Sequence, residues 1–304
     1  MKNILVVGSI NMDLVIKTDR MPELGETLTG SGFATNPGGK GANQAVAASR
    51  LGAEVRMIGA VGSDTYGETM KKVLTENGVS CDGVRSMDTT TGIAVITVCR
   101  GDNCILLDKG ANERVTPEYV GGYEELFIWA DFVIFQLEIP QESILAAARL
   151  AKKHGANVVL NPAPAQPLDS ELLSLTDILV PNEHEAALIL DTVIRTPQQE
   201  EDAVRKLLDL GIEHAVITLG SRGCIFNDET GIRRQAAYHV DAVDTTAAGD
   251  SFIAALCVGL SHGLPFSGSV SYASAVSALA VTKEGAIPSL PFASEVREFM
   301  DKMR

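Results

Sequence analysis

The segment DAVDTTAAGDSFIAAL, residues 241–256, places two acidic residues around a run of small residues and in front of an apolar helical pattern. Asp244 and Asp250 are six residues apart. Small residues at the start of a helix leave its first amides accessible, and these amides together with the helix dipole favour an anion. A carboxylate in the same turn would repel a bound phosphate. An acid at this position therefore needs a function that outweighs the repulsion. We expect Asp250 to act as a general base that takes a proton from an attacking hydroxyl, or else to be an ordinary first-turn acid that the dipole favours.

A glycine-rich segment, NPGGKGANQAVAASRLG at residues 36–52, is a second place where a ligand could bind. Gly38 and Gly39 precede a helical pattern, and glycines there allow the backbone to approach a ligand closely. Lys40 and Asn43 are three residues apart, so they lie on one face of the first helical turn. The order GxxxxGKS/T is absent, which excludes a Walker A loop. A turn that only permits close helix packing is an equal alternative.

Polar residues also follow several expected strands. In GSINMD, residues 8–13, Asn11 and Asp13 lie on the same side of a strand, where they suit sugar hydroxyls or serve as caps. In VPNEHEA, residues 180–186, Asn182 and Glu185 suit a hydrated Mg²⁺, although spacing alone favours a helix cap with a first-turn acid. Glu138 ends the segment DFVIFQLE as a lone acid.

The glycine-rich segment ITLGSRGC, residues 217–224, is a strand that runs into a turn. This turn either lines a nucleotide pocket or is merely tight. The five histidines have neither metal nor triad spacing, and GxSxG and GxGxxG are both absent. These absences argue against an α/β-hydrolase and against a dinucleotide-binding site.

Composition excludes several classes of function. The net charge of −14 over 304 residues repels phosphate backbones, so nucleic-acid binding is not expected. No apolar stretch reaches about 18 residues, and MKNILVVGSINMD predicts a strand rather than a signal peptide, so we expect a cytoplasmic protein. None of the five cysteines has zinc spacing. Cys99 and Cys104 flank RGDN, where they could face each other across a hairpin tip as a reduced pair.

Alternating strand and helix patterns predict an α/β fold. Buried parallel strands are expected at 4–9, 55–62, 131–138, 157–164, 177–182 and 214–220. Helices are expected at 40–51, 66–77, 141–154, 183–190, 197–210 and 249–262, with a closing amphipathic helix at 291–304. Residues 13–39 and 89–112 instead alternate apolar and polar side chains, which predicts half-exposed antiparallel strands that form a small separate sheet.

Taken together, NPGGKGANQAVAASRLG and DTTAAGDSF resemble the paired signatures of the ribokinase (PfkB-type) sugar-kinase family. Supporting motifs run through almost the whole chain: GSINMD, LNPAPA, PNEHEA, TLGSRG and AVTKEGAIPS. The resemblance implies a three-layer α/β/α fold with a mostly parallel central sheet and a small β-sheet lid. The body would be residues 1–12, 36–88 and 111–304, and the lid would be residues 13–35 and 89–110. Family members often form homodimers through the lid.

The resemblance also implies an activity. GSINMD, GGKGANQ and NPAPA are more similar to the ribose-phosphorylating branch than to fructokinases, adenosine kinases or phosphofructokinases. It implies ATP-dependent phosphorylation of the primary 5-hydroxyl of D-ribose, with Mg²⁺ and an activating K⁺. The alternative is a kinase of the same fold that acts on deoxyribose, a nucleoside or another sugar.

The family pattern assigns roles residue by residue. Asp250 matches the catalytic base, and the anion hole matches Ala247, Ala248 and Gly249. The sugar-binding positions match Asn11, Asp13, Gly39, Lys40, Asn43 and Glu138. The nucleotide-binding positions match Asn182, Thr218, Gly220, Gly223, Gly249 and Ser274. Glu185 matches an Mg²⁺ position that acts through water, and the K⁺ loops match Asp244, Thr246, Ala280, Lys283, Gly285 and Ser289.

Two positions depart from the usual family pattern. The common turn is Gly-Ala-Gly-Asp, but residue 247 is Ala. Because alanine has a Cβ atom and resists positive φ, we expect an αR or β conformation there. Ser274 stands where many relatives carry a larger polar residue.

Overall fold

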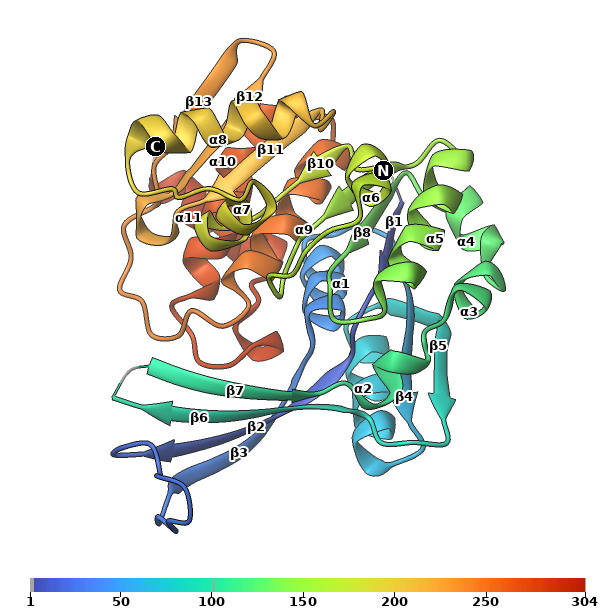
Figure 1. Ribbon diagram of the computed structural model, residues 1–304, viewed down its shortest axis with the longest axis vertical. Coiled ribbons are helices and arrows are strands. Elements are labelled where there is room, and N and C mark those ends of the chain that lie inside the picture. Colours follow the sequence, from blue (N-terminus) through green and yellow to red (C-terminus); the bar gives the residue numbers. More distant parts are fainter. Residues whose placement is uncertain (1–2, 101, 304) are drawn as a thin grey trace.

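The computed structural model describes residues 3–100 and 102–303, and its centre is one large sheet with helices on both faces (Figure 1). Residues 1–2, 101 and 304 lie outside the described residues, so the predictions for the body, the lid and the RGDN tip are not described at these positions. The parallel strands of the large sheet are β1 (Ile4–Val7), β4 (Val55–Gly62), β5 (Val79–Met87), β8 (Phe132–Phe135), β9 (Asn157–Leu160), β10 (Ile178–Leu179) and β11 (His214–Thr218). Two antiparallel strands, β12 (Cys224–Asp228) and β13 (Gly231–Gln235), extend one edge. The order is β13-β12-β11-β10-β9-β8-β1-β4-β5, so the predicted mostly parallel sheet is confirmed.

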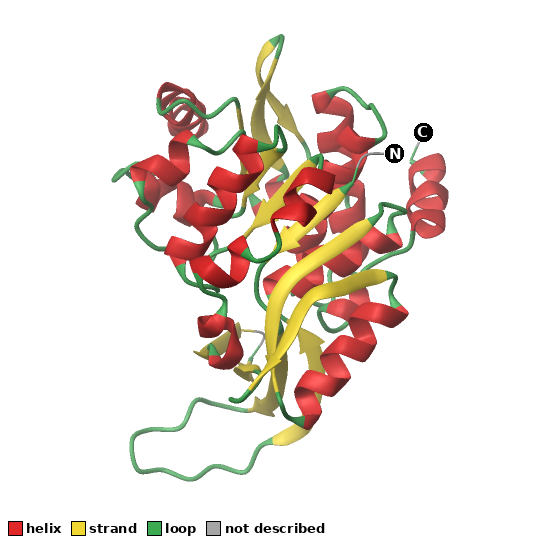
Figure 2. Ribbon diagram, turned by 90° about the vertical axis from the view of Figure 1, so that its right-hand side faces the viewer, coloured by secondary structure: helices red, strands yellow, loops and turns green. Residues whose placement is uncertain are grey.

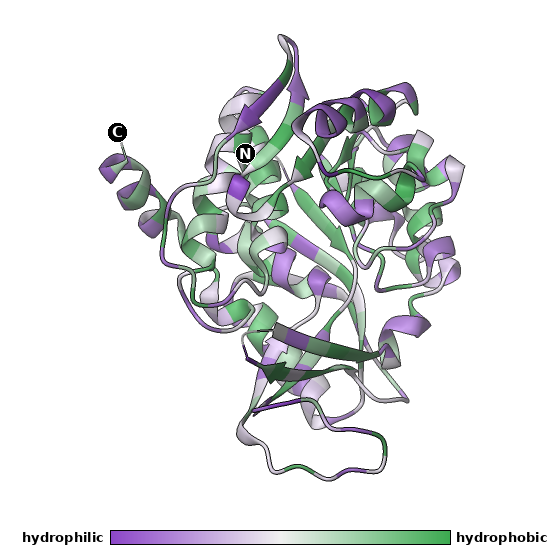
Figure 3. Ribbon diagram, turned by 60° about the vertical axis from the view of Figure 1, so that its left-hand side comes forward, coloured by the Kyte–Doolittle hydropathy of each residue, from purple (hydrophilic) through white to green (hydrophobic). Residues whose placement is uncertain are grey.

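The large sheet is buried on both faces because its strands are apolar at successive positions. Ile4 and Val6 of β1 pack into one hydrophobic cluster, whereas Leu5 and Val7 pack into a second cluster on the opposite face. This alternation follows from the two-residue period of a strand. In Figure 3 the strands inside the body are accordingly coloured as hydrophobic.

Two layers of helices cover the sheet. One layer contains α1 (Lys40–Arg50), α2 (Thr65–Glu76), α9 (Ala248–Ser261), α10 (Phe266–Ala280) and α11 (Ala293–Lys302). The other contains α3 (Pro117–Gly121), α4 (Glu124–Trp129), α5 (Gln141–Lys153), α6 (Ser170–Ser174), α7 (Glu183–Ile189) and α8 (Pro197–Asp209). Short 3₁₀ turns lie at η1 (Gly110–Arg114), η2 (Gly220–Arg222) and η3 (Ile287–Ser289). Within the described ranges, no helix combines the length and the apolar character that crossing a membrane requires.

The predicted helices are all present, and α3, α4, α6 and α10 are additional. The segment of α10, FSGSVSYASAVSALA, is rich in serine and small residues and has no charged face. A helix buried between neighbours lacks the amphipathic period that reveals a surface helix, which explains why the sequence did not predict it.

A separate four-stranded sheet projects from one end of the body (Figure 1). We call β2 (Asn11–Thr18), β3 (Ser31–Gly38), β6 (Gly92–Cys99) and β7 (Asp102–Asp108) the small sheet, and its order is β3-β2-β6-β7. Its two hairpins are antiparallel, but β2 and β6 pair in parallel from Asn11 opposite Gly92 to Thr18 opposite Cys99. The expectation of antiparallel strands throughout was therefore wrong. A long loop, residues 19–30, joins β2 to β3 (Figure 2).

The register of the β6–β7 hairpin corrects the expected cysteine pair. Cys99 lies opposite Asp102 and Cys104 lies opposite Thr97, so the two cysteines do not face each other. Both thiols are free, as are those of Cys81, Cys224 and Cys257.

Candidate active site

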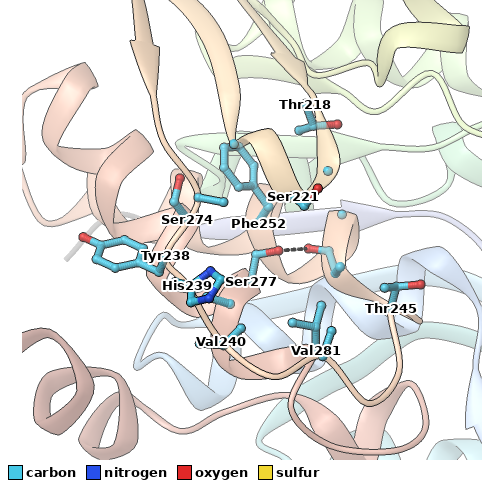
Figure 4. Close-up of a pocket in the computed structure, with 17 residues that line it drawn as sticks. Thr218, Ser221, Tyr238, His239, Val240, Thr245, Phe252, Ser274, Ser277 and Val281 are labelled. Carbon is cyan, nitrogen blue, oxygen red and sulfur yellow. Dashed lines mark hydrogen bonds between the residues drawn. The ribbon is translucent and has the colours of Figure 1, made fainter. Parts of the chain in front are cut away.

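Two cavities meet at the N-terminus of α9. The first, which we call the small-sheet cavity, has a volume of about 610 Å³ and lies between the small sheet and the body. The second, which we call the α10 cavity, has a volume of about 400 Å³ and lies beside η2 and α10 (Figure 4). The residues that line both are Thr218, Thr245, Ala248 and Gly249. A group that moves from one cavity to the other must therefore pass the first turn of α9.

Asp250, in the first turn of α9, lines the small-sheet cavity and is only 5% exposed. Its two carboxylate oxygens accept hydrogen bonds from different amides. Asn43 Nδ2 donates to Oδ2 at 2.9 Å, and Gln44 Nε2 donates to Oδ1 at 2.9 Å. No cation pairs with it directly among the described residues. The carboxylate is thus fixed in orientation by neutral donors at the wall of a cavity.

The turn before Asp250 corrects one prediction. Ala247 has φ 59° and ψ 10°, which is the left-handed region, not the αR or β conformation that we expected from its Cβ atom. The conformation lets the chain enter α9 abruptly, and the first helical hydrogen bond runs from the Ser251 amide to the Ala247 carbonyl. The Ala248 amide donates to Thr245, but no partner is found for the amides of Gly249 and Asp250 within residues 3–100 and 102–303. These two amides are available to an anion. Of the expected Ala247, Ala248 and Gly249 hole, the Ala248 amide is therefore already engaged.

A cluster of acids surrounds Lys40 on the floor of the small-sheet cavity. Asp13, Glu138, Glu185 and Asp250 all line this cavity together with Lys40. Burial, followed by the charges of Glu138 and Asp250, raises the pKa of Asp13 to about 7. Burial would lower the pKa of Lys40, but the carboxylates of Asp250 and Glu138 raise it above its ordinary value. The cavity therefore offers charged acceptors and one ammonium group at close quarters.

The sugar-binding positions implied by the sequence converge there. Asn11, Asp13, Gly39, Lys40, Asn43 and Glu138 all line the small-sheet cavity. Glu138 accepts hydrogen bonds from Ser9 Oγ at 2.5 Å and from Asn11 Nδ2 at 3.3 Å. Asn43 Oδ1 is buried and has no hydrogen-bond partner among the described residues, so it is free to accept one from a ligand.

Asn182 and Glu185 confirm the helix cap that their spacing favoured, and they also line a cavity. They form a capping box on α7, in which Asn182 Oδ1 accepts from the Glu185 amide and Glu185 Oε2 accepts from the Asn182 amide. They also line the small-sheet cavity, and burial raises the pKa of Glu185. Asn182 was expected on the nucleotide side, but it does not line the α10 cavity.

The remaining nucleotide positions line the α10 cavity: Thr218, Gly220, Gly223, Gly249 and Ser274. Ser274 Oγ donates to the carbonyl of Val270 on its own helix, which occupies its hydroxyl hydrogen. Sequence reasoning missed most of the wall. Tyr238, His239, Val240, Phe252, Ser277 and Val281 also line the cavity (Figure 4). Phe252 and Val281 lie within the motifs DTTAAGDSF and AVTKEGAIPS but were not singled out, and the other four lie outside the motifs, since a wall built from apolar and hydroxyl side chains leaves little compositional signal.

The two loops implied to hold a monovalent cation are joined by Asp244. Its Oδ1 accepts from the Thr246 amide and hydroxyl, and its Oδ2 accepts from the Gly285 amide at 2.9 Å. Burial opposes it, but these hydrogen bonds hold the pKa of Asp244 below its ordinary value. Ser289 is buried and Lys283 Nζ pairs with Glu295, so Lys283 could contribute only backbone oxygen. An ionised carboxylate among hydroxyl and carbonyl oxygens fits a hard cation.

Further residues line the small-sheet cavity or support the residues that line it. Alternate residues of β6 and β7 line it: Ala94, Ile96, Asn103, Ile105 and Leu107. Asn112 donates to Asn11 Oδ1 at 2.7 Å and accepts from the Ile10 amide, which fixes the start of β2. Gln44 is fully buried on α1 and contacts Asp250. Its signal in the sequence is a long polar side chain within a helix of small apolar residues.

Comparison with known proteins gives consistent matches over nearly the whole chain. Residues 1–293 match the family model described as pfkB family carbohydrate kinase. A ribokinase of Schizosaccharomyces pombe is 43% identical over 97% of this chain and 97% of its own length. A ribokinase of Lactococcus lactis is 41% identical over 98% of this chain and 96% of its own. The structure of Arabidopsis thaliana ribokinase complexed with ribose and ATP has a TM-score of 0.92, with 34% identity and 98% of each chain covered.

Proposed function

This chain belongs to the pfkB family of carbohydrate kinases, and we propose that it transfers the γ-phosphoryl group of ATP to the primary 5-hydroxyl of D-ribose. The product is ribose 5-phosphate. The observation that carries the proposal is the meeting of two cavities at the first turn of α9, with the Asp250 carboxylate on the acid-lined side. The identity to ribokinases over almost the full length supports ribose as the acceptor.

Each cavity has the chemistry of one substrate. The small-sheet cavity presents Asp13, Glu138 and Asn43 to a polyhydroxylated ligand, because carboxylates and amides pair with sugar hydroxyls. The α10 cavity presents small, apolar and hydroxyl groups, which suit the adenosine part of ATP. The γ-phosphoryl group would then lie where the cavities meet.

Asp250 takes the proton from the attacking hydroxyl, and its two amide partners hold it in place. The amides of Gly249 and Asp250, with the dipole of α9, stabilise the charge on the phosphoryl group in transit. Lys40 adds a positive charge on the same side. Closure of the small sheet as a lid, over the range 13–35 and 89–110, excludes the water that would otherwise accept the phosphoryl group.

Two cations fit the donors that the chain provides. Glu185, through water, would hold Mg²⁺, and the loops that contain Asp244, Thr246, Ala280, Lys283, Gly285 and Ser289 would hold K⁺. Bound Mg²⁺ supplies charge neutralisation for the triphosphate, and K⁺ would brace the loop that leads into α9.

We further propose a cytoplasmic homodimer formed through the small sheet. Ala94, Ile96, Ile105 and Leu107 face the cavity, so the alternation of the strands places Val95 and Leu106 on the other face. These two residues are cross-strand neighbours that are 41% and 71% exposed. Leu106→Glu should convert a dimer to a monomer in sedimentation experiments; a wild-type monomer would refute this arrangement.

The test of the activity is ADP release measured over a panel of D-ribose, 2-deoxy-D-ribose, D-fructose and adenosine, with Mg²⁺ present and with or without K⁺. We expect the highest kcat/KM for D-ribose and a lower rate without K⁺. A higher kcat/KM for deoxyribose or a nucleoside would mean that this compound, and not D-ribose, is the acceptor. No ADP release with any sugar would overturn the kinase assignment of the site.

A further inference from the structure

A chain of buried amides leads from the interior of the sheet to the Asp250 carboxylate. Gln136, which follows β8, donates from Nε2 to Gln44 Oε1 at 2.6 Å. Gln44, on α1, donates in turn from Nε2 to Asp250 Oδ1 at 2.9 Å. Both glutamine side chains are completely buried. Three elements far apart in sequence thus converge on one carboxylate.

The direction of this chain is set by chemistry. An ionised carboxylate only accepts hydrogen bonds, so the Gln44 amide must turn its NH₂ group toward Asp250 and its oxygen away. The oxygen then needs a donor, and Gln136 Nε2 is that donor. Gln44 Nε2 also donates to Asn161 Oδ1 at 3.4 Å, so Gln136 fixes the oxygen end of the Gln44 amide while Asp250 and Asn161 hold its NH₂ end.

The arrangement keeps a polar atom without a partner. Gln136 Oε1 is buried and makes no hydrogen bond among the described residues. Space for it exists because residue 8 is glycine, since a Cβ atom there would lie 1.9 Å from Gln136 Oε1. A buried orphan oxygen destabilises a fold, and such local exceptions are typical of sites kept for function.

Neutral donors also suit a base better than a cation would. A Lys or Arg at the place of Gln44 would fix a carboxylate equally well, but its charge would reduce the affinity of that carboxylate for a proton. Amides orient the carboxylate without placing a full positive charge against it. Asn43 Nδ2, on the other oxygen, acts in the same way.

We propose that Gln44 is a positioning residue whose amide, oriented by Gln136, holds Asp250 in the orientation needed to receive the proton of the acceptor hydroxyl. The inference rests on the proposed function, in which Asp250 is the base. It assigns Gln44 and Gln136 to turnover and not to the affinity for either substrate, because neither side chain lines the cavities.

The experiment compares Gln44→Met, Gln136→Met and the double variant with the wild type, using whichever sugar of the panel the wild type phosphorylates best. A wrong acceptor assignment therefore leaves the comparison intact. Methionine has a similar length and neither donates nor accepts strongly. We expect Gln44→Met to lower kcat on the order of 10- to 100-fold, while both KM values stay within about threefold. Gln136→Met should lower kcat less, and the double variant should be no slower than Gln44→Met, because the two residues act in series.

Val46→Ala is the matched control, since Val46 is fully buried on the same helix and does not line either cavity. It should lower thermal stability while kcat stays at the wild-type value. A Gln44→Met variant with wild-type kcat, or a double variant whose losses multiply, would overturn the proposal. If Gln44→Met does not fold, Gln136→Met decides: a lower kcat with unchanged KM supports the relay and an unchanged kcat refutes it.

Gln44→Glu gives a readout that a structural role would not produce. A protonated carboxyl can still donate to Asp250, whereas an ionised one cannot. Its kcat relative to the wild type should therefore fall as the pH rises. A pH-independent ratio would contradict the hydrogen-bond role.

Discussion

The two cavities differ in the charge of their walls. The small-sheet cavity is lined by Asp13, Glu138, Glu185 and Asp250 around Lys40, whereas no Asp, Glu, Lys or Arg of the described residues lines the α10 cavity. In the proposed function, individual charged groups would therefore determine ligand binding in the small-sheet cavity. Shape and backbone contacts would determine it in the α10 cavity, where each side chain would contribute a small share. Single substitutions should therefore have large effects on the first side and small effects on the second.

The largest effect is expected from Asp250→Asn. Removing the base should lower kcat about 10³-fold, because a neutral amide cannot accept the proton, while KM for ATP changes little. Steady-state kinetics and a thermal unfolding curve test this together. Near-normal turnover in a folded variant would show that Asp250 is only a first-turn acid.

The next effect separates the two cavities directly. Asp13→Ala should raise KM for the sugar roughly 10- to 100-fold, the value of one or two hydrogen bonds to a charged group, without changing KM for ATP. The matched variant in the α10 cavity, His239→Ala, should raise KM for ATP only about fivefold and leave the sugar unaffected. Equal losses on both sides in either variant would contradict the division.

The pH should affect ligand binding in the small-sheet cavity alone. Asp13, which faces Glu138, Asp250 and Lys40, has a pKa of about 7, so KM for the sugar should rise as the pH falls through this value and the carboxylate is protonated. KM for ATP should stay constant over the same range. If KM for the sugar does not change with pH in the wild type, the Asp13 carboxylate does not take part in sugar recognition.

The same shift has a cost in stability with a defined sign. The folded pKa of Asp13 lies above its ordinary value of 3.8, so the folded state holds this proton more tightly. The contribution of Asp13 to the free energy of unfolding is fully present below pH 3.8 and is lost as the pH rises to about 7. Asp13→Asn should accordingly raise the melting temperature at pH values above 7 and not in acid, as differential scanning calorimetry can measure.

The smallest effect is expected at the boundary of the two cavities. Ala247→Gly removes the strain of a left-handed alanine, about 1 kcal/mol, but adds flexibility to the unfolded chain. The free energy of unfolding should rise by about 1 kcal/mol or less, with kcat within about twofold of the wild type. A clear loss of stability in denaturant titrations would mean that the alanine methyl group packs usefully.

The sequence predicted the charged cavity better than the neutral one. Asn11, Asp13 and Lys40 belong to motifs because few residue types suit their proposed roles, whereas Glu138 is a lone acid that only the family resemblance assigned. The wall of the α10 cavity contains Val240, Phe252 and Val281, which are indistinguishable in sequence from ordinary core residues. Gly220 and Gly223 were predicted because turns need glycine, and both have positive φ.

The sequence also could not predict how segments far apart in the chain pair with each other. Alternation in residues 13–39 and 89–112 revealed strands, but it could not show that β2 and β6 run in parallel, because a period of two is common to both pairings. For Ala247, intrinsic preference predicted the wrong conformation. Ala247 packs against the core cluster that contains α9, and such contacts between distant segments cannot be predicted from local sequence.

Strand β2 connects the small-sheet cavity to the small sheet. Asn11 and Asp13 stand at the start of β2, which continues to Thr18 in the small sheet, with a register shift against β3 between Val15 and Lys17. We therefore expect a movement of that sheet to displace Asn11 and Asp13, and a ligand bound to these two residues to restrain the movement. A fluorophore on the exposed thiol of Cys104 would therefore brighten or dim with sugar concentration, with no alteration to the binding groups themselves.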